Sequence, residues 1–151
     1  MSDTSATPEE QTSEAVVAFR VMNVESVLFD LHDSSPMVHL IEAEAPFRYL
    51  AIPIALPEAV ALNNALTGVT PRRPGTHDIA HEVLKGTQTD VIAARIVRLE
   101  NGVYFAELDL MTPKGRLVLD CRTSDAINFA LRQVPRAPVL CASEVLEALY
   151  S

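Results

Sequence analysis

Hydrophobic and polar positions alternate with a period of two in several stretches of the chain and change to helical spacing in four others. Strands are expected, in chain order, at residues 20–31, 37–43, 47–54, 90–99, 103–111, 116–121 and 139–141. Helices are expected at residues 56–67, 77–85, 124–133 and 144–149. Strands and helices do not alternate regularly, so we predict a single α+β domain with a mostly antiparallel sheet and about four short helices.

The strands from residue 90 to residue 121 are expected to form a meander. Asn101-Gly102 is a strong hairpin signal, and residues 112–115 form a second turn. Counting outward from these turns places Glu107 opposite Asp120 and, on the other side, opposite Ile96. One face of the meander is expected to belong to the core, and it carries Tyr104, Ala106, Leu108, Leu110, Leu117, Leu119 and Cys121.

The other face of the meander gathers charged side chains. Glu107, Asp109 and Asp120 lie on it together with Arg98 and Arg122. Like charges that face each other across strands reduce stability unless something neutralises them. Either the two arginines or a Mg²⁺ or Mn²⁺ ion bound by the three carboxylates could do so. A solvated lattice of salt bridges is the alternative to a metal site.

A strand-to-helix junction is predicted at residues 119–132, with Thr123 or Ser124 as the helix cap. Arg122 and Asp125 lie on either side of that junction, where rigid elements hold side chains that still reach solvent. A second helix is predicted to begin at His77, with Thr76 as its cap.

Two sequence blocks carry a family resemblance. Residues 122–132 read Arg-Thr-Ser-Asp-Ala-Ile-Asn-Phe-Ala-Leu-Arg, and residues 73–79 read Arg-Pro-Gly-Thr-His-Asp-Ile. Both blocks resemble signature segments of the bifunctional nuclease (BFN) domain family, in the same order, with a match that spans about residues 22–149. Thr123 departs from the proline that the family usually has at this position.

The resemblance implies a domain at residues 20–151 with nuclease activity on RNA and DNA. The candidate catalytic residues are Asp125, Asp120, Glu107 and His77, and the candidate metal ligands are Glu107, Asp109 and Asp120. Arg122, Arg73 and Arg132 are candidates for binding substrate phosphates. A metal-binding pair formed by His77 and His81, four residues apart on one helix face, is a weaker alternative.

Charge changes this picture in one respect. The formal net charge is −8, yet residues 71–136 hold ten bases against eight acids. An acidic protein repels phosphate at long range and would be a poor passive nucleic-acid binder. Work on nucleic acid would therefore use the arginines of the second half, a bound metal, or both.

The remaining features concern location and assembly. Residues 1–19 are polar, with four acids and no base, and are expected to be a disordered tail. No secretion signal or membrane span is evident, which favours the cytoplasm. The exposed meander edge favours a homo-oligomer. Two functions stay open: a divalent-metal-dependent nuclease, and a non-catalytic oligomeric binding or regulatory module.

Overall fold

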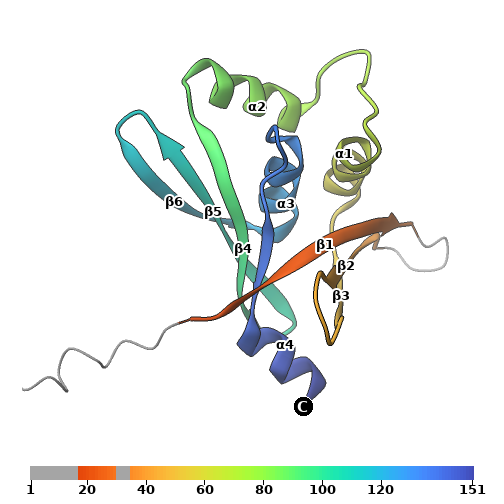
Figure 1. Cartoon of the computed structure of the whole chain (residues 1–151). Helices are drawn as coiled ribbons and strands as arrows, with labels where there is room; N and C mark the ends of the chain where they lie inside the picture. Colours follow the sequence, from red (N-terminus) through yellow and green to blue (C-terminus); the bar gives the residue numbers. More distant parts are fainter. Residues whose placement is uncertain (1–16, 30–34) are drawn as a thin grey trace, which may run out of the picture.

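The computed structural model describes residues 17–29 and 35–151, and in these residues one seven-stranded sheet carries four helices (Figure 1). The strands are β1 (Phe19–Leu28), β2 (Met37–Glu42), β3 (Tyr49–Pro53), β4 (Asp90–Glu100), β5 (Val103–Thr112), β6 (Gly115–Arg122) and β7 (Val139–Ala142). The helices are α1 (Leu56–Thr67), α2 (Thr76–Gly86), α3 (Thr123–Arg132) and α4 (Ser143–Tyr150). The predicted single α+β domain is confirmed.

The sheet joins two antiparallel halves through one late strand. Its order is β3-β2-β1-β7-β4-β5-β6, so β7 separates the strands from the two halves of the chain. β7 pairs antiparallel with β1 and parallel with β4, while the other described pairings are antiparallel. The expectation of a mostly antiparallel sheet holds.

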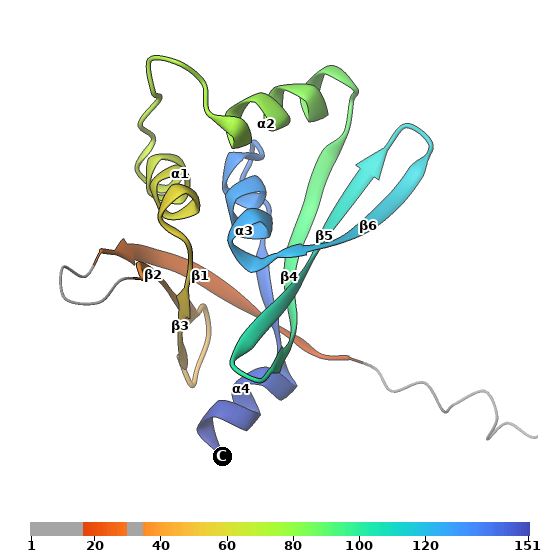
Figure 2. The same ribbon diagram turned by 180° about the vertical axis from the view of Figure 1, so that it is seen from behind.

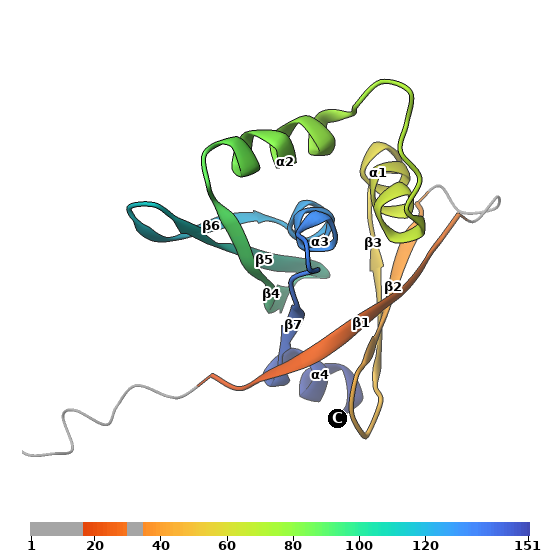
Figure 3. The ribbon, with the colours of Figure 1, turned by 45° about the horizontal axis from the view of Figure 1, so that its top comes forward.

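The helices occupy two places. α1, α2 and α3 lie together at one end of the molecule, and α4 lies at the other (Figures 1 and 2). α3 lies between the two halves of the sheet (Figure 3), where it packs on β4 and β5 and contacts both α1 and α2. The largest fully buried apolar side chains are Leu40, Leu50, Leu62, Ile96, Ile127 and Leu146.

The helix boundaries follow local chemistry, with two corrections to the predicted caps. Gly68 ends α1 in the left-handed region, at φ 74°. The N-caps of α2 and α3 are Gly75 and Arg122, so Thr76 and Thr123 already lie inside the first turns. The predicted caps Thr76 and Thr123 or Ser124 are therefore wrong, because each helix starts one residue earlier than its hydroxyl side chains suggested.

The predicted register of the meander is right on one side and wrong on the other. Glu107 pairs with Asp120 between β5 and β6, as expected. Glu107 faces Arg95 rather than Ile96 on β4, because an irregularity between Ile96 and Arg98 shifts the register by one residue. A bulge of this kind has no reliable signal in a sequence that alternates throughout.

β6 is the outer strand of the meander and is exposed on both faces. Leu117 and Leu119 are 45% and 42% exposed, although they were predicted to be core residues. They share a face with Leu108 and Leu110, which are buried. The prediction fails for Leu117 and Leu119 because α3 covers β5 and only the end of β6.

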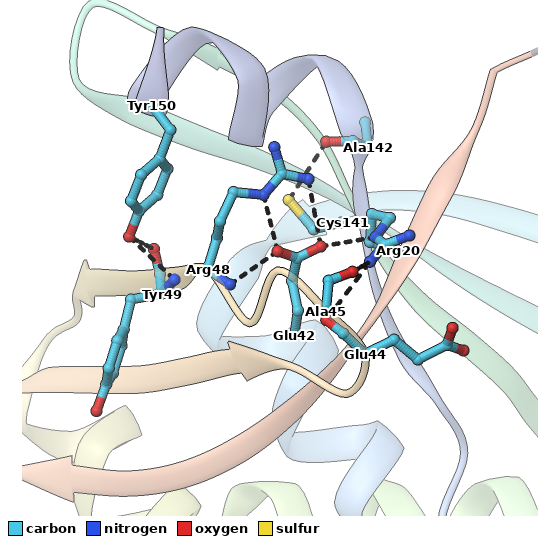
Figure 4. Close-up of polar contacts among 9 residues, drawn as sticks. All are labelled: Arg20, Glu42, Glu44, Ala45, Arg48, Tyr49, Cys141, Ala142 and Tyr150. Atoms are coloured by element: carbon cyan, nitrogen blue, oxygen red, sulfur yellow. Dashed lines mark hydrogen bonds and ion pairs between the residues drawn. The ribbon is translucent and has the colours of Figure 1, made fainter.

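A buried carboxylate holds the other half of the sheet together (Figure 4). The Glu42 side chain is fully buried and receives the Arg20 Nε at 2.6 Å and the Arg48 Nε at 2.7 Å. The backbone N–H of Arg48 donates to the same carboxylate at 2.8 Å. Hydrogen bonds from the two arginines thus join β1, β2 and the segment that leads into β3.

Two sequence predictions fall partly outside the described residues. Residues 1–16 of the predicted tail at residues 1–19 lie outside the described part of the chain. β1 begins at Phe19, the last residue of that predicted tail and one residue before the predicted strand. The predicted end of the first strand, at residues 30–31, also lies outside. In the described part of the chain, no helix has both the length and the apolar character needed to cross a membrane.

Candidate active site

A cavity of about 620 Å³ lies where α1, α2 and α3 meet the end of β6. The first turn of each of these helices contributes one acidic residue to it: Glu58 from α1, Asp78 from α2 and Asp125 from α3. Negative charge is favoured at helix N-termini, which explains why acids stand at all three positions. Its charged and titratable lining consists of Glu58, Arg73, His77, Asp78, Asp120, Cys121, Arg122, Asp125 and Arg132.

Four of these side chains form a continuous hydrogen-bonded chain. His77 Nε2 lies 2.8 Å from Asp125 Oδ1, and Arg122 Nε donates to Asp125 Oδ2, also at 2.8 Å. Arg122 Nη2 donates to Glu58 Oε1 at 3.0 Å. His77 and Asp125 are 48 residues apart in sequence, so only the fold brings the two family-like blocks into contact.

The electrostatics of these four hydrogen-bonded side chains favour a charged Asp125. Burial raises the pKa of Asp125, but hydrogen bonds from Arg122 and His77 outweigh it, and the pKa is lower than that of an ordinary aspartate. The pKa of Arg122 is raised, chiefly by its hydrogen bond to Asp125. The Arg122 side chain nevertheless remains 64% exposed, so it can also contact a ligand in the cavity.

A second ion pair in the lining of the cavity joins α2 to α3. Arg132 Nε donates to Asp78 Oδ1 at 3.1 Å, and Asp78 Oδ2 accepts from the backbone N–H of Gly75 at 2.9 Å. Arg132 also donates to Asn128 Oδ1 at 2.7 Å and to the Ala61 carbonyl at 3.1 Å. Arg132 is thus committed to protein contacts from three helices, and its side chain is only 9% exposed.

The same contacts lower the pKa of Asp78. Burial raises the pKa of Asp78, but hydrogen bonds from the Gly75 backbone and from Arg132 bring it below the ordinary aspartate value. The local geometry therefore gives Asp78 and Arg132 the role of holding α2 and α3 in place. Direct substrate binding by Arg132 stays a prediction.

Glu58 belongs to this site, although sequence reasoning did not single it out. It lies 64 residues from Arg122 in the chain, and the helix dipole alone accounts for an acid near the start of α1. Its second oxygen, Oε2, is buried and has no hydrogen-bond partner among the described residues. No local sequence signal could have joined Glu58 to Arg122, because only the packing of α1 against α3 does so.

The three carboxylates predicted to bind a metal are not equivalent. Asp120 faces Glu107 in the register and lines the cavity. Asp109 is buried and its carboxylate is paired with both Arg95 and Arg116, so it does not fit the role of a metal ligand. Among the described residues, no group of three or more His, Cys, Asp or Glu side chains has metal-binding geometry.

The arginines expected to neutralise this face lie elsewhere. Arg98 pairs with Glu100 at 3.1 Å and stacks over the ring of Phe105 at 4.2 Å. Arg122 is held by Asp125 and Glu58. The facing pair of Glu107 and Asp120 therefore has no ion-pair partner in the described part of the chain.

The two histidines of α2 take different surroundings. His77 lines the cavity and packs against Phe129, with ring centroids 5.6 Å apart. His81 lines a separate cavity beside Lys85 and Asp90. Burial and, next, Lys85 lower the pKa of His81, which favours the neutral ring.

Comparison with known proteins adds a family and two relatives. The family model described as "Bifunctional nuclease domain" matches residues 38–150. Two Mycobacterium tuberculosis proteins, the uncharacterized proteins MT1877 (strain CDC 1551 / Oshkosh) and Rv1829 (strain ATCC 25618 / H37Rv), are each 33% identical over 99 residues. That match covers 66% of this chain and 58% of each relative, so the chain spans little more than half the length of the curated relatives it matches.

Proposed function

Because the chain belongs to the bifunctional nuclease domain family, we propose that the cavity between α1, α2 and α3 hydrolyses phosphodiester bonds of RNA or DNA. The observation that carries the proposal is the contact between His77 and Asp125 at 2.8 Å, with Arg122 on the other carboxylate oxygen. A base, a group that orients it and a guanidinium thus meet in one cavity. This is the arrangement expected for general-base attack on a phosphate.

The hydrogen bond assigns the proton on His77. A carboxylate only accepts hydrogen bonds, so Nε2 carries the hydrogen that it donates to Asp125. Nδ1 of His77 is then the nitrogen that can take a proton from an attacking water. Asp125 fixes the ring and stabilises the imidazolium that forms, the part that a buried carboxylate plays beside a catalytic histidine.

Phosphate binding would use Arg122 together with Arg73 and the helix starts. Arg122 keeps an exposed face, and Arg73 lines the cavity from the connection between α1 and α2. Backbone N–H groups at a helix N-terminus attract anions, and the first turns of three helices border this cavity. This local attraction would act against the repulsion from a protein with a net charge of −8.

Asp120 and Glu107 enter the proposal with less support. Asp120 lines the cavity and could donate a proton to the oxygen that leaves, whereas Glu107 is its cross-strand neighbour. A Mg²⁺ or Mn²⁺-assisted form of the reaction rests on these two carboxylates alone, because Asp109 is held by arginines.

The test is an assay on single- and double-stranded RNA and DNA, with EDTA, Mg²⁺ or Mn²⁺. We expect His77→Asn and Asp125→Asn each to lower kcat by about 10²–10⁴-fold, the usual contribution of a positioned general base. The matched control is His81→Asn, on the same helix but lining another cavity, which should keep wild-type kcat. Equal activity in wild type and in both cavity variants, purified separately, would exclude this site.

A second function has one specific observation in its favour. Arg122 is already paired with two acids, and Arg132 with Asp78, so much of the positive charge is neutralised within the protein. A non-catalytic binding or regulatory module that presents these groups to a small anion or to another protein would also use the cavity. Saturable binding of an oligonucleotide or phosphate without turnover in any metal condition would favour this module.

We also propose that the protein assembles as a homo-oligomer, because an exposed strand edge is readily covered by another subunit. β6 ends the sheet, and most of its side chains are exposed.

A further inference from the structure

Glu58 places a fixed negative charge in the lining of the candidate active site. Its Oε1 accepts from Arg122 Nη2 at 3.0 Å, and its backbone carbonyl accepts from the Asn128 side chain at 3.3 Å. Asn128 is fully buried in α3, so this contact fastens α1 to α3 at Glu58. The Glu58 side chain is only 14% exposed, which leaves it little room to turn towards solvent. A ligand that reaches Arg122 therefore meets this carboxylate as well.

The carboxylate of Glu58 is less fully partnered than those of Asp78 and Asp125. Both oxygens of Asp125 are in hydrogen bonds, one with His77 and one with Arg122, and both oxygens of Asp78 are also bonded. Oε2 of Glu58 is buried and has no hydrogen-bond partner among the described residues. Its one ion pair in this part of the chain is with Arg122, which it shares with Asp125. One guanidinium thus serves two carboxylates, and the three groups together carry a negative charge.

The charge of the whole cavity has the same sign. Its lining holds four carboxylates and three guanidinium groups, from Glu58, Asp78, Asp120, Asp125, Arg73, Arg122 and Arg132. With the histidine counted as neutral, four acids against three arginines leave one negative charge. Coulomb energy is proportional to the charge of the ligand, so a doubly charged anion is disfavoured here about twice as strongly as a singly charged one.

The phosphate groups of nucleic acids differ in this property. A phosphodiester inside a strand carries one negative charge, whereas a phosphate on the end of a strand carries about −1.5 to −2 at pH 7. Both present oxygens that a guanidinium can bind, so Arg122 and Arg73 do not by themselves distinguish them. A carboxylate fixed beside Arg122 does, because its repulsion grows with the charge of the phosphate.

We propose that Glu58 is a specificity-determining residue, which makes the cavity select singly charged phosphodiesters and reject doubly charged terminal phosphates. The cavity then binds the interior of a strand in preference to a phosphorylated end. This inference rests on the phosphate-binding part of the proposed function, and it does not require that the bound diester be hydrolysed. It depends on the charge of Glu58, whereas a purely structural role would depend on the shape of the side chain and its hydrogen bond.

Titration calorimetry of the full chain at pH 7 tests the inference without a cleavage assay. One probe is a phosphorothioate-linked thymidine dinucleotide, which carries one charge and resists hydrolysis, and the other is thymidine 5′-monophosphate, which carries nearly two. We expect wild type to bind the dinucleotide more tightly than the monophosphate. Glu58→Gln keeps the shape and removes the charge. It should bind the monophosphate about tenfold more tightly than wild type does and the dinucleotide only about threefold more tightly, because the Coulomb energy follows the charge of the probe.

Two control variants separate the charge of Glu58 from other effects. Glu58→Asp keeps the charge on a shorter side chain and should keep the selectivity of wild type. Glu144→Gln removes an exposed acid from the first turn of α4, at the other end of the molecule (Figures 1 and 2). It changes the net charge by the same amount without altering the cavity, so both affinities should match those of wild type.

The outcomes distinguish this inference from the proposed function. Equal changes for both probes in Glu58→Gln, or no change, would overturn the role of Glu58 and leave phosphate binding by the cavity intact. Loss of selectivity in Glu58→Asp as well would refute a role for charge. Absence of binding of both probes to wild type and to every variant would remove the phosphate site itself, and this inference with it. Binding with the expected selectivity, but without hydrolysis of any nucleic acid, would support the role of Glu58 and contradict the nuclease.

Discussion

Two buried acids are each held by a pair of arginines, one in each half of the sheet. Glu42 is held by Arg20 and Arg48, and Asp109 is held by Arg95 and Arg116. A buried charge that loses its partners is strongly destabilising, so these acids must remain paired. The same chemistry that makes them important for stability removes them from the set of groups available to a substrate.

Asp109→Asn distinguishes a structural acid from a metal ligand. We expect the free energy of unfolding in urea to fall by about 3 kcal/mol or more, since Arg95 loses its charged partner in a partly buried site. Glu107→Gln, two residues away on β5, should change the free energy of unfolding by less than about 0.5 kcal/mol. If Asp109 were a ligand, Mg²⁺ or Mn²⁺ would raise the unfolding midpoint of wild type and leave that of Asp109→Asn unchanged.

Glu42 should make stability depend on acid pH. The hydrogen bond from Arg48 is the largest cause of its lowered pKa, and although burial opposes it, the pKa falls from 4.5 to about 2. Because the folded pKa lies below the unfolded one, its contribution is complete above about pH 4.5 and disappears as the pH falls towards 2.

Urea unfolding of wild type and Glu42→Gln measures this effect. At pH 7 we expect the variant to be less stable by about 1.5–3 kcal/mol, the usual value of hydrogen bonds to a charged group. The difference should shrink steadily below pH 4.5, whereas Glu44→Gln, at an exposed neighbouring position, should match wild type throughout. A gap that stays constant down to pH 2 would contradict the assignment.

At the residue scale, the sequence predicted the members of the site better than their partners. The two family-like blocks pointed to His77, Asp125, Arg122 and Arg73, all of which line one cavity. Glu58 was missed, and the two arginine partners of Asp109 were not foreseen, for the same reason. Pairing across 64 residues, or with a strand shifted by an irregularity, depends on packing that no local pattern encodes.

At the scale of elements, the predictions failed mainly at the edge strand β6 and at the helix starts. The alternation of β5 and β6 predicted their register correctly, but it could not show that β6 lies beyond the cover of α3. Helix starts were predicted within one residue, because Ser, Thr and Gly all favour such positions and the backbone alone decides among them. Edges and caps are therefore where structure corrected the sequence.

Tyr150→Phe tests whether α4 protects the β3 edge. The change removes two hydrogen bonds to the backbone of Tyr49 and should lower the free energy of unfolding by about 0.5–1.5 kcal/mol. Tyr49→Phe is the matched control, because its backbone and not its hydroxyl meets Tyr150. Chemical denaturation measures the stability of both variants, and sedimentation detects any new association. Equal stability of the two variants would argue against protection of the β3 edge by the Tyr150 hydroxyl.

At the scale of the whole molecule, the class of fold was predictable and its strand order was not. Alternating strands, helices and turns determined an α+β domain, and the Asn101-Gly102 hairpin determined the meander. No pattern in residues 139–142 predicts that β7 lies between β1 and β4, because a four-residue apolar strand fits many positions in a sheet. Its location depends on the burial of both its faces.

The central place of β7 has a consequence for synthesis on the ribosome. A nascent chain that has emerged only as far as residue 138 holds three strands of one half-sheet and three of the other, with an empty slot where β7 belongs. Until β7 emerges, β1 and β4 each lack the strand that pairs with them in the finished sheet. The speed of translation near residue 138 therefore sets how long these two strands can pair with another chain instead.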